Sequence, residues 1–592
     1  MKPTRLFDLI ELQLSQFPKS DSINGKVDGK WVSFSTADVL AESNRASLAL
    51  KRLGVKHGDR VAIISMNRPE WNFIDLGALQ LGAVTVPFYP TLADEELVHV
   101  INHSGSKILI VEDTKNLRRL DRLKDQLTSL EEIYSIDPMA GRKSWKEQLP
   151  SLDDPEIASI DAIKANVKTS DLASIIYTSG TTGTPKGVML AHSNILSNLL
   201  ESKTLLPIDS TCRALSFLPL CHIFERSVNY IYMYLGVSIY YAESLATIAN
   251  DLQDVKPQVF VSVPRLIEKL YGKIVEKGKK LEGLQRKIFD WSLTVAEGYE
   301  KGETVSLLKD AELLLARKVV FKKWHQALGG QIRVIISGGA AINPKLMQTF
   351  AAADIHILEG YGLTETSAMS TVNRFPKKDQ KLGTVGPVVD GVKVKIVHEE
   401  GYPKGEGEIL IKGGHVMTGY FKDEKATAET MTADGWFKTG DIGRLVDGKF
   451  LKITDRKKEL FKTSNGKYVA PLSIESRLKE NPIIEYVMVV GAGEKHPCVL
   501  IVPNFDELKL RHPGIDLSGN KHDLATSEAV RAPFKEWIRE VNKQLGHWEQ
   551  IKAFTLLADE WTVDSGELTP TLKLKRKIIA NKHAEKIQAL YV

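Results

Sequence analysis

The chain has 592 residues, of which 43% are hydrophobic and 26% are charged, which fits a globular protein of two or more domains and excludes a collagen-like or disordered chain. Its 79 basic and 74 acidic residues leave a net charge of +5, which is too small to indicate a nucleic-acid-binding protein. The three cysteines, Cys212, Cys221 and Cys498, have spacings that fit neither a disulfide framework nor a zinc site, so we expect reduced thiols in a cytoplasmic protein.

The N-terminal sequence, MKPTRLFDLIELQ, lacks the apolar segment and the small-residue cleavage site of a signal peptide. No window reaches the roughly 18 uncharged apolar residues that a membrane-spanning helix needs. Residues 230–242, YIYMYLGVSIYYA, are too few for a span and indicate the end of a buried helix followed by a strand. We therefore expect a protein that does not cross a membrane.

Two segments of nearly equal length share the order strand, helix, strand, helix, strand. In residues 60–111 the apolar stretches VAIISM, VTVPF and KILIVE alternate with helical patterns, the first of which opens with Pro69. In residues 213–263 the stretches ALSFLP, VSIYYA and QVFVSVP alternate with helical patterns in the same way. This repetition predicts two similar parallel sheets covered by helices, although chance alternation would give the same pattern.

Two later segments differ from these units in composition and in expected secondary structure. Residues 270–328 are helical, lysine-rich and amphipathic, which is typical of a solvated helical hairpin; a basic surface that rests on anionic lipid is the alternative. Near Asp455 a charged, turn-rich connector, DRKKELFKTSNGKYVAP, precedes hairpin-like strands and a lysine-rich C-terminal helix. We therefore predict an N-terminal domain of residues 1–455 and an α+β C-terminal domain of residues 456–592.

The stretch YTSGTTGTPKGV, residues 177–188, combines five Ser or Thr side chains, three glycines and Lys186 directly after an apolar strand. It matches neither a Walker A loop, which would need glycine where Pro185 stands, nor the dinucleotide-binding pattern. Because GVMLAH indicates a strand before a helix begins near Ser193, a helix dipole cannot supply anion binding. Backbone amides, hydroxyls and the Lys186 ammonium would supply it instead. The stretch is therefore either a polyphosphate loop or a solvated linker.

Other short stretches carry groups that suit a nucleotide. EGYGLTET offers an aromatic face for a base and, in Glu365, a carboxylate for a hard cation. WFKTGDIG places Asp441 in a predicted tight turn, where it would accept hydrogen bonds from ribose hydroxyls, and DRKKE supplies Arg456 shortly after it. LTPTLKLKR holds Lys573 in a predicted exposed turn bounded by proline. Each alone would also suit a turn, a helix cap or a surface charge.

In this order the stretches resemble the adenylate-forming enzymes, which include acyl-CoA synthetases, peptide-synthetase adenylation domains and luciferases, over nearly the whole chain. FLPLCHIFER, VPRLIEKLY and the helical insertion resemble most the long-chain fatty acyl-CoA synthetase branch. The resemblance implies an α/β fold with a large N-terminal domain of two similar βαβαβ-built sheets plus a small barrel-like β region, and a small mobile α+β C-terminal domain. It also implies activation of a fatty acid by ATP to an acyl-adenylate with release of pyrophosphate, then transfer to coenzyme A with release of AMP.

The resemblance assigns roles to individual residues. Thr178 and Glu365 would place Mg²⁺, and Tyr361 would stack on adenine, while Asp441 and Arg456 would bind the ribose hydroxyls. The phosphates would be held by Ser179, Gly180, Thr181, Thr182, Gly183 and Lys186. The other residues that it assigns to nucleotide binding are Gly338, Gly339, Ala340, Glu359, Gly360, Gly362 and Thr364.

The resemblance also implies that two faces of the C-terminal domain serve the two half-reactions. Lys573 would contact the α-phosphate and the attacking carboxylate as a fixed cation, and His222 would lie near the acyl pocket. Rotation about a hinge at Lys458 would replace Lys573 by the turn at Gly466, beside the pantetheine arm of coenzyme A.

The chain departs from the family pattern at two points. Many relatives have Ser-Gly-Lys around the C-terminal lysine, whereas this chain has Thr-Leu-Lys at residues 571–573, and Lys575 and Lys577 are close enough to confuse the register. Asp455 stands where a glycine usually precedes the hinge arginine. Because aspartate is a good turn residue, we expect the second change to be tolerated.

Several alternatives stay open from the sequence. In one alternative the substrate is an aryl or short-chain acid. In another the acceptor is a carrier protein, and the chain is a fatty acyl-AMP ligase. A non-catalytic lipid- or nucleotide-binding protein and a kinase are alternatives from other classes, since fold alone does not define function. The expected ligands are a fatty acid, ATP, Mg²⁺ and coenzyme A, without nucleic acid, and residues 270–328 are the expected contact with a membrane surface.

Overall fold

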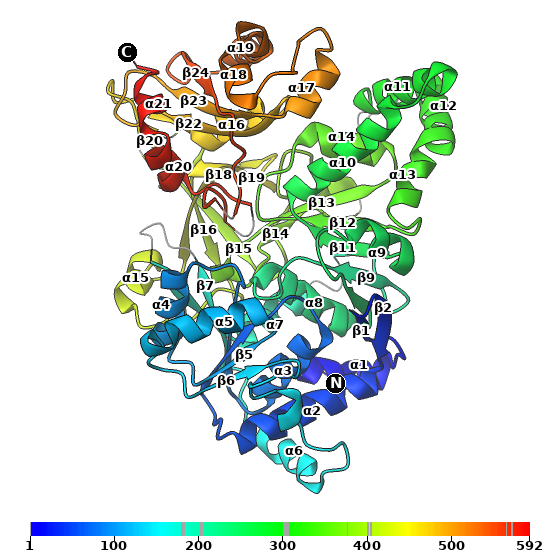
Figure 1. Ribbon diagram of the computed structural model, residues 1–592, viewed down its shortest axis with the longest axis vertical. Coiled ribbons are helices and arrows are strands. Elements are labelled where there is room, and N and C mark those ends of the chain that lie inside the picture. The colour runs from blue at the N-terminus through cyan, green and yellow to red at the C-terminus, as the bar shows by residue number, and fades with distance from the viewer. Residues whose placement is uncertain are drawn as a thin grey trace.

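The computed structural model describes residues 2–178, 184–201, 205–299, 307–375, 377–399, 402, 405–563, 565–569 and 572–591. Two large sheets with helices around them form most of a large N-terminal domain, and a smaller C-terminal domain lies at one end of it, at the top in Figure 1. Between them lies a four-stranded sheet. This α/β architecture confirms the fold class that the sequence predicts.

The first sheet has seven strands in the order β17-β8-β7-β4-β3-β5-β6. Most of its central strands are buried along their length, which explains their almost unbroken apolar sequences. The strands are β3 (Arg60–Ile64), β4 (Val84–Phe88), β5 (Ile108–Val111), β6 (Glu132–Ser135), β7 (Leu172–Thr178), β8 (Lys186–Ala191) and β17 (Gly419–Tyr420). The helices around it are α2 (Thr36–Arg52), α3 (Pro69–Gln80), α4 (Asp94–Ser104), α5 (Thr114–Leu123) and α6 (Ser159–Lys164).

The second sheet has eight strands in the order β14-β13-β12-β11-β9-β10-β1-β2. Its strands are β1 (Ile23–Val27), β2 (Lys30–Phe34), β9 (Arg213–Ser216), β10 (Ser238–Tyr241), β11 (Val259–Ser262), β12 (Val334–Ser337), β13 (His356–Tyr361) and β14 (Thr371–Val372). The helices nearby are α1 (Asp8–Gln16), α7 (His192–Glu201), α8 (Ile223–Leu235), α9 (Ile248–Val255) and α14 (Pro344–Ala352).

The predicted repeat is confirmed down to its strand order. The unit β3-α3-β4-α4-β5 pairs as β4-β3-β5, and the unit β9-α8-β10-α9-β11 pairs as β10-β9-β11, with every pair parallel. The sheets as a whole are mixed, because β8, β17, β14 and β2 pair antiparallel with their neighbours.

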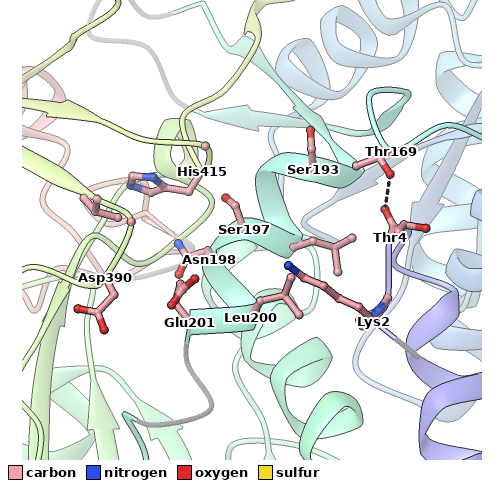
Figure 2. A pocket seen from close by; sticks show the side chains of 15 residues that line it. Lys2, Thr4, Thr169, Ser193, Ser197, Asn198, Leu200, Glu201, Asp390 and His415 are labelled. Carbon is pink, nitrogen blue, oxygen red and sulfur yellow. Dashed lines mark hydrogen bonds between the residues drawn. The ribbon is translucent and has the colours of Figure 1, made fainter.

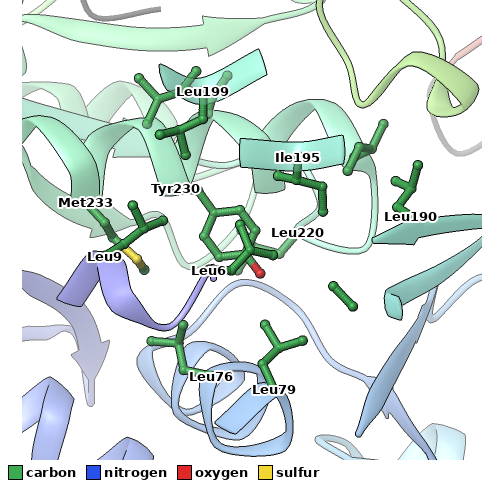
Figure 3. Packing of buried hydrophobic residues seen from close by; sticks show 14 of the residues in the cluster. Leu6, Leu9, Leu76, Leu79, Leu190, Ile195, Leu199, Leu220, Tyr230 and Met233 are labelled. Atoms are coloured by element: carbon green, nitrogen blue, oxygen red, sulfur yellow. The ribbon is translucent and has the colours of Figure 1, made fainter. Parts of the chain in front are cut away.

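The interior between the two sheets is apolar. Leu6 and Leu9 near the N-terminus, Leu76 and Leu79 of α3 and Tyr230 of α8 converge there (Figure 3), and all five are 1% exposed or less. Full burial of a leucine side chain stabilises a fold by about 1.5–3 kcal/mol before entropy costs. This packing fixes α8 against the first sheet.

A buried polar network reinforces the same junction. Arg226 of α8 forms an ion pair with Asp75 of α3 and donates to Thr85 Oγ1 at 2.7 Å and Ser174 Oγ at 2.7 Å, while its Nε lies 3.0 Å from the Tyr230 hydroxyl. Burial of a charge is tolerated because all these partners share it. The network therefore holds the start of α8 between the sheets.

The predicted helical insertion consists of α10 (Pro264–Lys279), α11 (Gly283–Glu297), α12 (Leu307–Ala316), the π-helical turn η5 (Arg317–Phe321) and α13 (Lys322–Ala327). It does not stand free in solvent. Rings of Tyr271 and Trp324 pack on Phe350 of α14, with centroids 6.1 and 5.9 Å from it. The insertion therefore extends the core of the second sheet, beside α14 in Figure 1.

The expected barrel-like region is an open sheet. The strands β15 (Lys393–Val397), β16 (Gly407–Lys412), β18 (Phe437–Val446) and β19 (Phe450–Arg456) pair antiparallel in that order. Among the described residues no ladder joins β15 to β19, so the sheet does not close. The helix α15 (Glu424–Thr430) precedes β18.

The C-terminal domain is built on a three-stranded sheet in which β22 (Ile484–Val490) and β23 (Cys498–Pro503) form the predicted antiparallel pair and β24 (Phe554–Leu556) adds in parallel. Its other elements are β20 (Phe461–Lys462), β21 (Tyr468–Val469), α16 (Pro471–Leu478), α17 (Phe505–Arg511), α18 (Lys521–Thr526), α19 (Glu528–Asn542), α20 (Arg576–Lys582) and α21 (Ala584–Gln588). None of the helices in the described ranges has both the length and the apolar character of a transmembrane span. All three cysteines are buried.

Candidate active site

A carboxylate, a guanidinium and a phenol meet at the junction of the two domains. Asp441 of β18 and Arg456 of β19 are cross-strand partners, and Arg456 Nε lies 3.2 Å from Asp441 Oδ1. The hydroxyl of Tyr361, at the end of β13, donates to Asp441 Oδ2 at 2.7 Å. Burial raises the pKa of Asp441, whereas the charge of Arg456 and the Tyr361 hydrogen bond oppose that rise. The three predicted residues therefore form one cluster.

The predicted tight turn at Asp441 is wrong. Asp441 lies inside β18, because pairing with β16 on one side and β19 on the other carries the strand through the glycine-containing stretch. The glycines of this stretch mark local irregularities of the strand instead of a turn. Gly440 has a φ of +72°, and the pairing with β19 shifts register between Ile442 and Gly443.

The charge of Lys573, in the C-terminal domain, interacts with this cluster. The pKa of Lys573 is lowered to about 8, chiefly by burial and also by the charge of Arg456, while Asp441 and Glu365 act in the opposite direction. The predicted exposed turn is therefore wrong for this side chain, which docking of the C-terminal domain encloses in part. Of the two other lysines that the register left open, Lys577 is exposed on α20, and Lys575 is half-buried at the N-cap of that helix.

Two hydrogen bonds join Lys573 to Thr569. The Thr569 amide donates to the Lys573 carbonyl at 2.8 Å, and the Lys573 amide donates to Thr569 Oγ1 at 3.0 Å. Leu572 has a φ of +60°, a left-handed value that costs energy in a non-glycine residue.

A second group surrounds the phenol of Tyr420 in β17. Its hydroxyl donates to Glu365 Oε1 at 2.8 Å, and the Lys186 ammonium lies 5.3 Å from the centre of its ring. Lys186 is also 3.4 Å from Asp423 Oδ2 and is the cross-strand partner of Thr178. Burial raises the pKa of Glu365. Three predicted residues, Thr178, Lys186 and Glu365, thus gather around one that was not predicted.

Tyr420 and Asp423 were missed because their position depends on long-range pairing. They lie in TGYFKDE, more than 200 residues after β8, and reach Lys186 because β17 pairs with β8. A tyrosine and an aspartate in a charged stretch carry no chemical signal by themselves.

Close backbone packing explains several predicted glycines. A Cβ at Gly362 would lie 1.7 Å from the Ala368 carbonyl oxygen, and one at Gly338 would lie 2.9 Å from the Phe224 ring. Glu359 is buried and accepts from the Ile342 amide at 3.2 Å, and burial raises its pKa to about 8. Gly360 lies in β13 itself, and Thr364 follows that strand closely. Gly339 and Ala340 follow β12, whose last residue, Ser337, pairs with Glu359 of β13.

His222 caps the N-terminus of α8, where its Nδ1 accepts from the Phe224 amide at 3.2 Å. Burial lowers the pKa of His222 to about 4, and the charge of Lys573 acts in the same direction. The imidazole is therefore neutral at physiological pH. The next turns of α8 face a small apolar cavity lined by Phe224, Val228 and Ile231, together with Leu199, Leu206, Ile336, Met369 and Val372.

A larger cavity of about 450 Å³ lies apart from these groups (Figure 2), between the N-terminal segment, α7 and His415. Asn198 of α7 lines both cavities and donates to the Met369 carbonyl at 2.6 Å, which braces the loop after Glu365. His415 is buried beside Ser370, and burial lowers its pKa to about 4. None of the described residues that the sequence predicts for the site lines the larger cavity, so we do not place the chemistry there.

The remaining predictions lie elsewhere. Lys458 is exposed in the turn after β19, and Gly466, with a φ of +73°, lies in an exposed turn between β20 and β21. Ser179, Gly180, Thr181, Thr182 and Gly183 lie outside the described residues.

Two family models match most of the chain. Residues 10–421 match the family model described as AMP-binding enzyme, and residues 459–592 match that of the AMP-binding enzyme C-terminal domain. The chain belongs to the AMP-binding enzyme family, so the resemblance to adenylate-forming enzymes is confirmed.

The curated relatives are similar over nearly the whole chain. The long-chain-fatty-acid–CoA ligase FadD15 of Mycobacterium tuberculosis is 34% identical over 576 residues, which cover 95% of this chain and 93% of that protein. Long-chain-fatty-acid–CoA ligase 5 of Mus musculus is 33% identical over 585 residues, 95% of this chain and 84% of that protein.

Solved structures share the fold. An anthranilate CoA ligase, AuaEII, in complex with anthranoyl-AMP has a TM-score of 0.71 and 19% identity, covering 98% of this chain and 97% of that chain. A Mycobacterium tuberculosis fatty acyl CoA synthetase has a TM-score of 0.65 and 21% identity, covering 98% and 99%.

Proposed function

We propose that the protein is a long-chain fatty acid–CoA ligase that activates its substrate with ATP and releases AMP. The observation that carries the proposal is the position of Lys573, a residue of the C-terminal domain whose charge interacts with Asp441, Arg456 and Glu365 across the junction of the two domains. The names of the full-length relatives support the same reaction.

In the first half-reaction a carboxylate oxygen of the fatty acid attacks the α-phosphorus of ATP, and the bond to the β-phosphate breaks to release pyrophosphate. Because two anions approach each other, a fixed cation stabilises the transition state. Lys573 fits this role, since with a pKa of about 8 it is mostly protonated at neutral pH. Asp441 and Arg456 would hold the ribose, and Tyr361 would fix Asp441 beside the adenine.

The residues around Tyr420 fit a magnesium ion. Glu365 is a half-buried carboxylate with one oxygen hydrogen-bonded to the Tyr420 hydroxyl, and the described residues contain no cluster of three His, Cys, Asp or Glu that would hold a metal alone. Mg²⁺ prefers such a partial set, because it keeps waters and takes substrate phosphate oxygens. Thr178 and Glu365 would hold it, where it would neutralise phosphate charge, and Lys186 would bind the phosphates beside it.

In the second half-reaction the thiol of coenzyme A loses its proton and attacks the acyl carbonyl, and AMP leaves. We propose that rotation about Lys458 withdraws Lys573 and brings the exposed turn at Gly466 to the site. The support is the exposed position of both Lys458 and Gly466.

The apolar cavity beside His222 supports a fatty acyl substrate. Phe224, Val228 and Ile231 follow the histidine on successive turns of α8 and face this cavity. A hydrocarbon chain that entered from the adenylate would lie along them.

Pyrophosphate release tests this function. It would be measured with ATP and Mg²⁺ across saturated acids from acetate to arachidate and benzoate, with and without coenzyme A. We expect turnover that peaks with long-chain acids and depends on coenzyme A. A peak with acetate or benzoate would show that the substrate is a short-chain or aryl acid. Activity independent of coenzyme A would indicate an acyl-AMP ligase, and no pyrophosphate release would support a non-catalytic binding protein.

The same proposal extends to a membrane surface, because α12 and η5 expose apolar and basic side chains together. Leu308, Leu314, Leu315 and Val319 are 79%, 64%, 53% and 43% exposed, and the neighbouring exposed lysines are Lys309, Lys318, Lys322 and Lys323. Apolar contact with added attraction to anionic lipid is the physics of peripheral binding.

Flotation with anionic vesicles tests this contact. We expect Leu314→Ser with Leu315→Ser to reduce binding, and high salt to reduce it as well. Leu152→Ser is the matched control, since Leu152 is equally exposed on the first half of the chain. Equal binding by all three proteins would refute the contact.

A further inference from the structure

Two histidines on α4 hold the strand ends from which Thr178 and Lys186 project. His103 Nδ1 lies 2.7 Å from the hydroxyl of Tyr177, the residue before Thr178. His99 Nε2 lies 3.3 Å from the carbonyl oxygen of Pro185, the residue before Lys186. One helix thus contacts both arms of the β7–β8 hairpin at equivalent positions.

The histidines form a packed unit. Their rings stack with centroids 5.3 Å apart, which the spacing of four residues on one helix allows. The His103 ring also meets the edge of Phe421, whose amide donates to the Gly187 carbonyl at 2.7 Å, and Lys422 donates to the His103 carbonyl at 2.8 Å. The hairpin end is therefore held from α4 on one side and from residues 421–422 on the other.

The hydrogen-bond roles follow from the partners. A carbonyl oxygen only accepts, so His99 must carry its hydrogen on Nε2. Burial lowers the pKa of His103, with His99 and Lys422 acting in the same direction and Asp423 against it, so neutral His103 accepts the Tyr177 hydroxyl hydrogen. Neither bond survives removal of the ring.

We propose that His99 and His103 are positioning residues for the polyphosphate of ATP: through Tyr177 and Pro185 they set the places of Thr178 and Lys186. The inference rests on the proposed function, because it takes these two residues as ligands of the phosphates and of Mg²⁺. A site whose groups are already held in place binds its ligand more tightly, because the entropy cost of ordering those groups does not have to be met on binding. Because AMP lacks the β- and γ-phosphates, its affinity should not change when either histidine is replaced.

The test compares two ligands by calorimetry: AMP, and α,β-methylene-ATP, which carries all three phosphates and is not cleaved between the first two. Loss of one such hydrogen bond should weaken the ATP analogue roughly three- to tenfold. We expect this loss for His103→Ala and for Tyr177→Phe, no further loss in the double variant, and an unchanged affinity for AMP. His99→Gln, which keeps a donor at similar reach, should bind the analogue better than His99→Ala.

Asn102→Ala is the matched control. Asn102 lies on the same helix and donates to the Gln126 carbonyl at 2.7 Å, away from the hairpin. Equal weakening of both ligands, or a loss in His103→Ala no larger than in the control, would overturn the proposal. Failure of the unchanged chain to release pyrophosphate would refute the proposed ligase, whereas the comparison of the two ligands would still test the histidines. Failure of that chain to bind the analogue would overturn both.

Discussion

Arg265, in the first turn of α10, forms an ion pair with Glu485 of β22, and its guanidinium lies 4.9 Å from the centre of the Tyr486 ring. This contact crosses from the large domain to the small one. Another ion pair between the domains, from Lys345 to Glu480, is 3.2 Å long and more exposed. Both contacts belong to the arrangement in which Lys573 lies in the site.

Arg265→Ala should therefore slow adenylate formation, because it removes a contact that favours this arrangement. A partly buried ion pair with a ring contact predicts an effect of roughly two- to fivefold. Thioester formation from supplied acyl-AMP should not slow. Arg286→Ala, which removes an ion pair internal to α11, is the control. A slower second half-reaction would contradict this account.

Lys573→Ala should reduce adenylate formation by about 10²–10³-fold, as the removal of other transition-state cations and donors does. Pyrophosphate release measures this step, and thioester formation from acyl-AMP measures the second. Lys577→Ala removes an exposed lysine of the same stretch and should leave both steps near normal. If Lys573→Ala impaired both steps equally, the separation of the two domain faces would be wrong.

The pH dependence of adenylate formation should carry the same signature. The protonated ammonium is the active form, so a pKa of about 8 means that activity is present below that pH and is lost as the pH rises through it. Lys573→Arg keeps its charge in this range, so its residual activity should not fall there. If the activity of Lys573→Arg still fell as the pH rose through about 8, the loss of activity would belong to another group.

Tyr420→Phe should raise the Mg²⁺ concentration needed for half-maximal activity severalfold, because Glu365 loses the hydroxyl that orients it. Unfolding temperature measured alongside separates this effect from instability. Tyr402→Phe is the control, since its hydroxyl contacts a surface carboxylate, Glu399. If both variants needed the same Mg²⁺ concentration for half-maximal activity, Tyr420 would have no role in the magnesium site.

Short-range patterns carried most of what the sequence could predict. The two repeated units follow from apolar strands and helical spacing, and Asp441, Arg456 and Glu365 follow from ordered motifs that resemble a family. Errors arose where tertiary contacts decide. Asp441 lies in a strand because two neighbouring strands pair with β18. Lys573 is enclosed in part because the domain that carries it docks on the large domain.

Other parts of the site left no pattern in the sequence. Tyr420 reaches Glu365 only through the pairing of β17 with β8. His99 and His103 look like ordinary members of an amphipathic helix until the neighbouring strands are placed beside them. The barrel-like region was expected from resemblance, and the ladders formed here leave it open.

The three buried cysteines open a route to observing the two domains directly. Burial raises the pKa of Cys212, Cys221 and Cys498, so these thiols are protonated as well as shielded and should react slowly with maleimides. A cysteine introduced at exposed Asn465 would then accept a fluorophore selectively without removal of native thiols. With a second dye on the large domain, energy transfer would follow the excursions of the small domain in single molecules as each substrate is added.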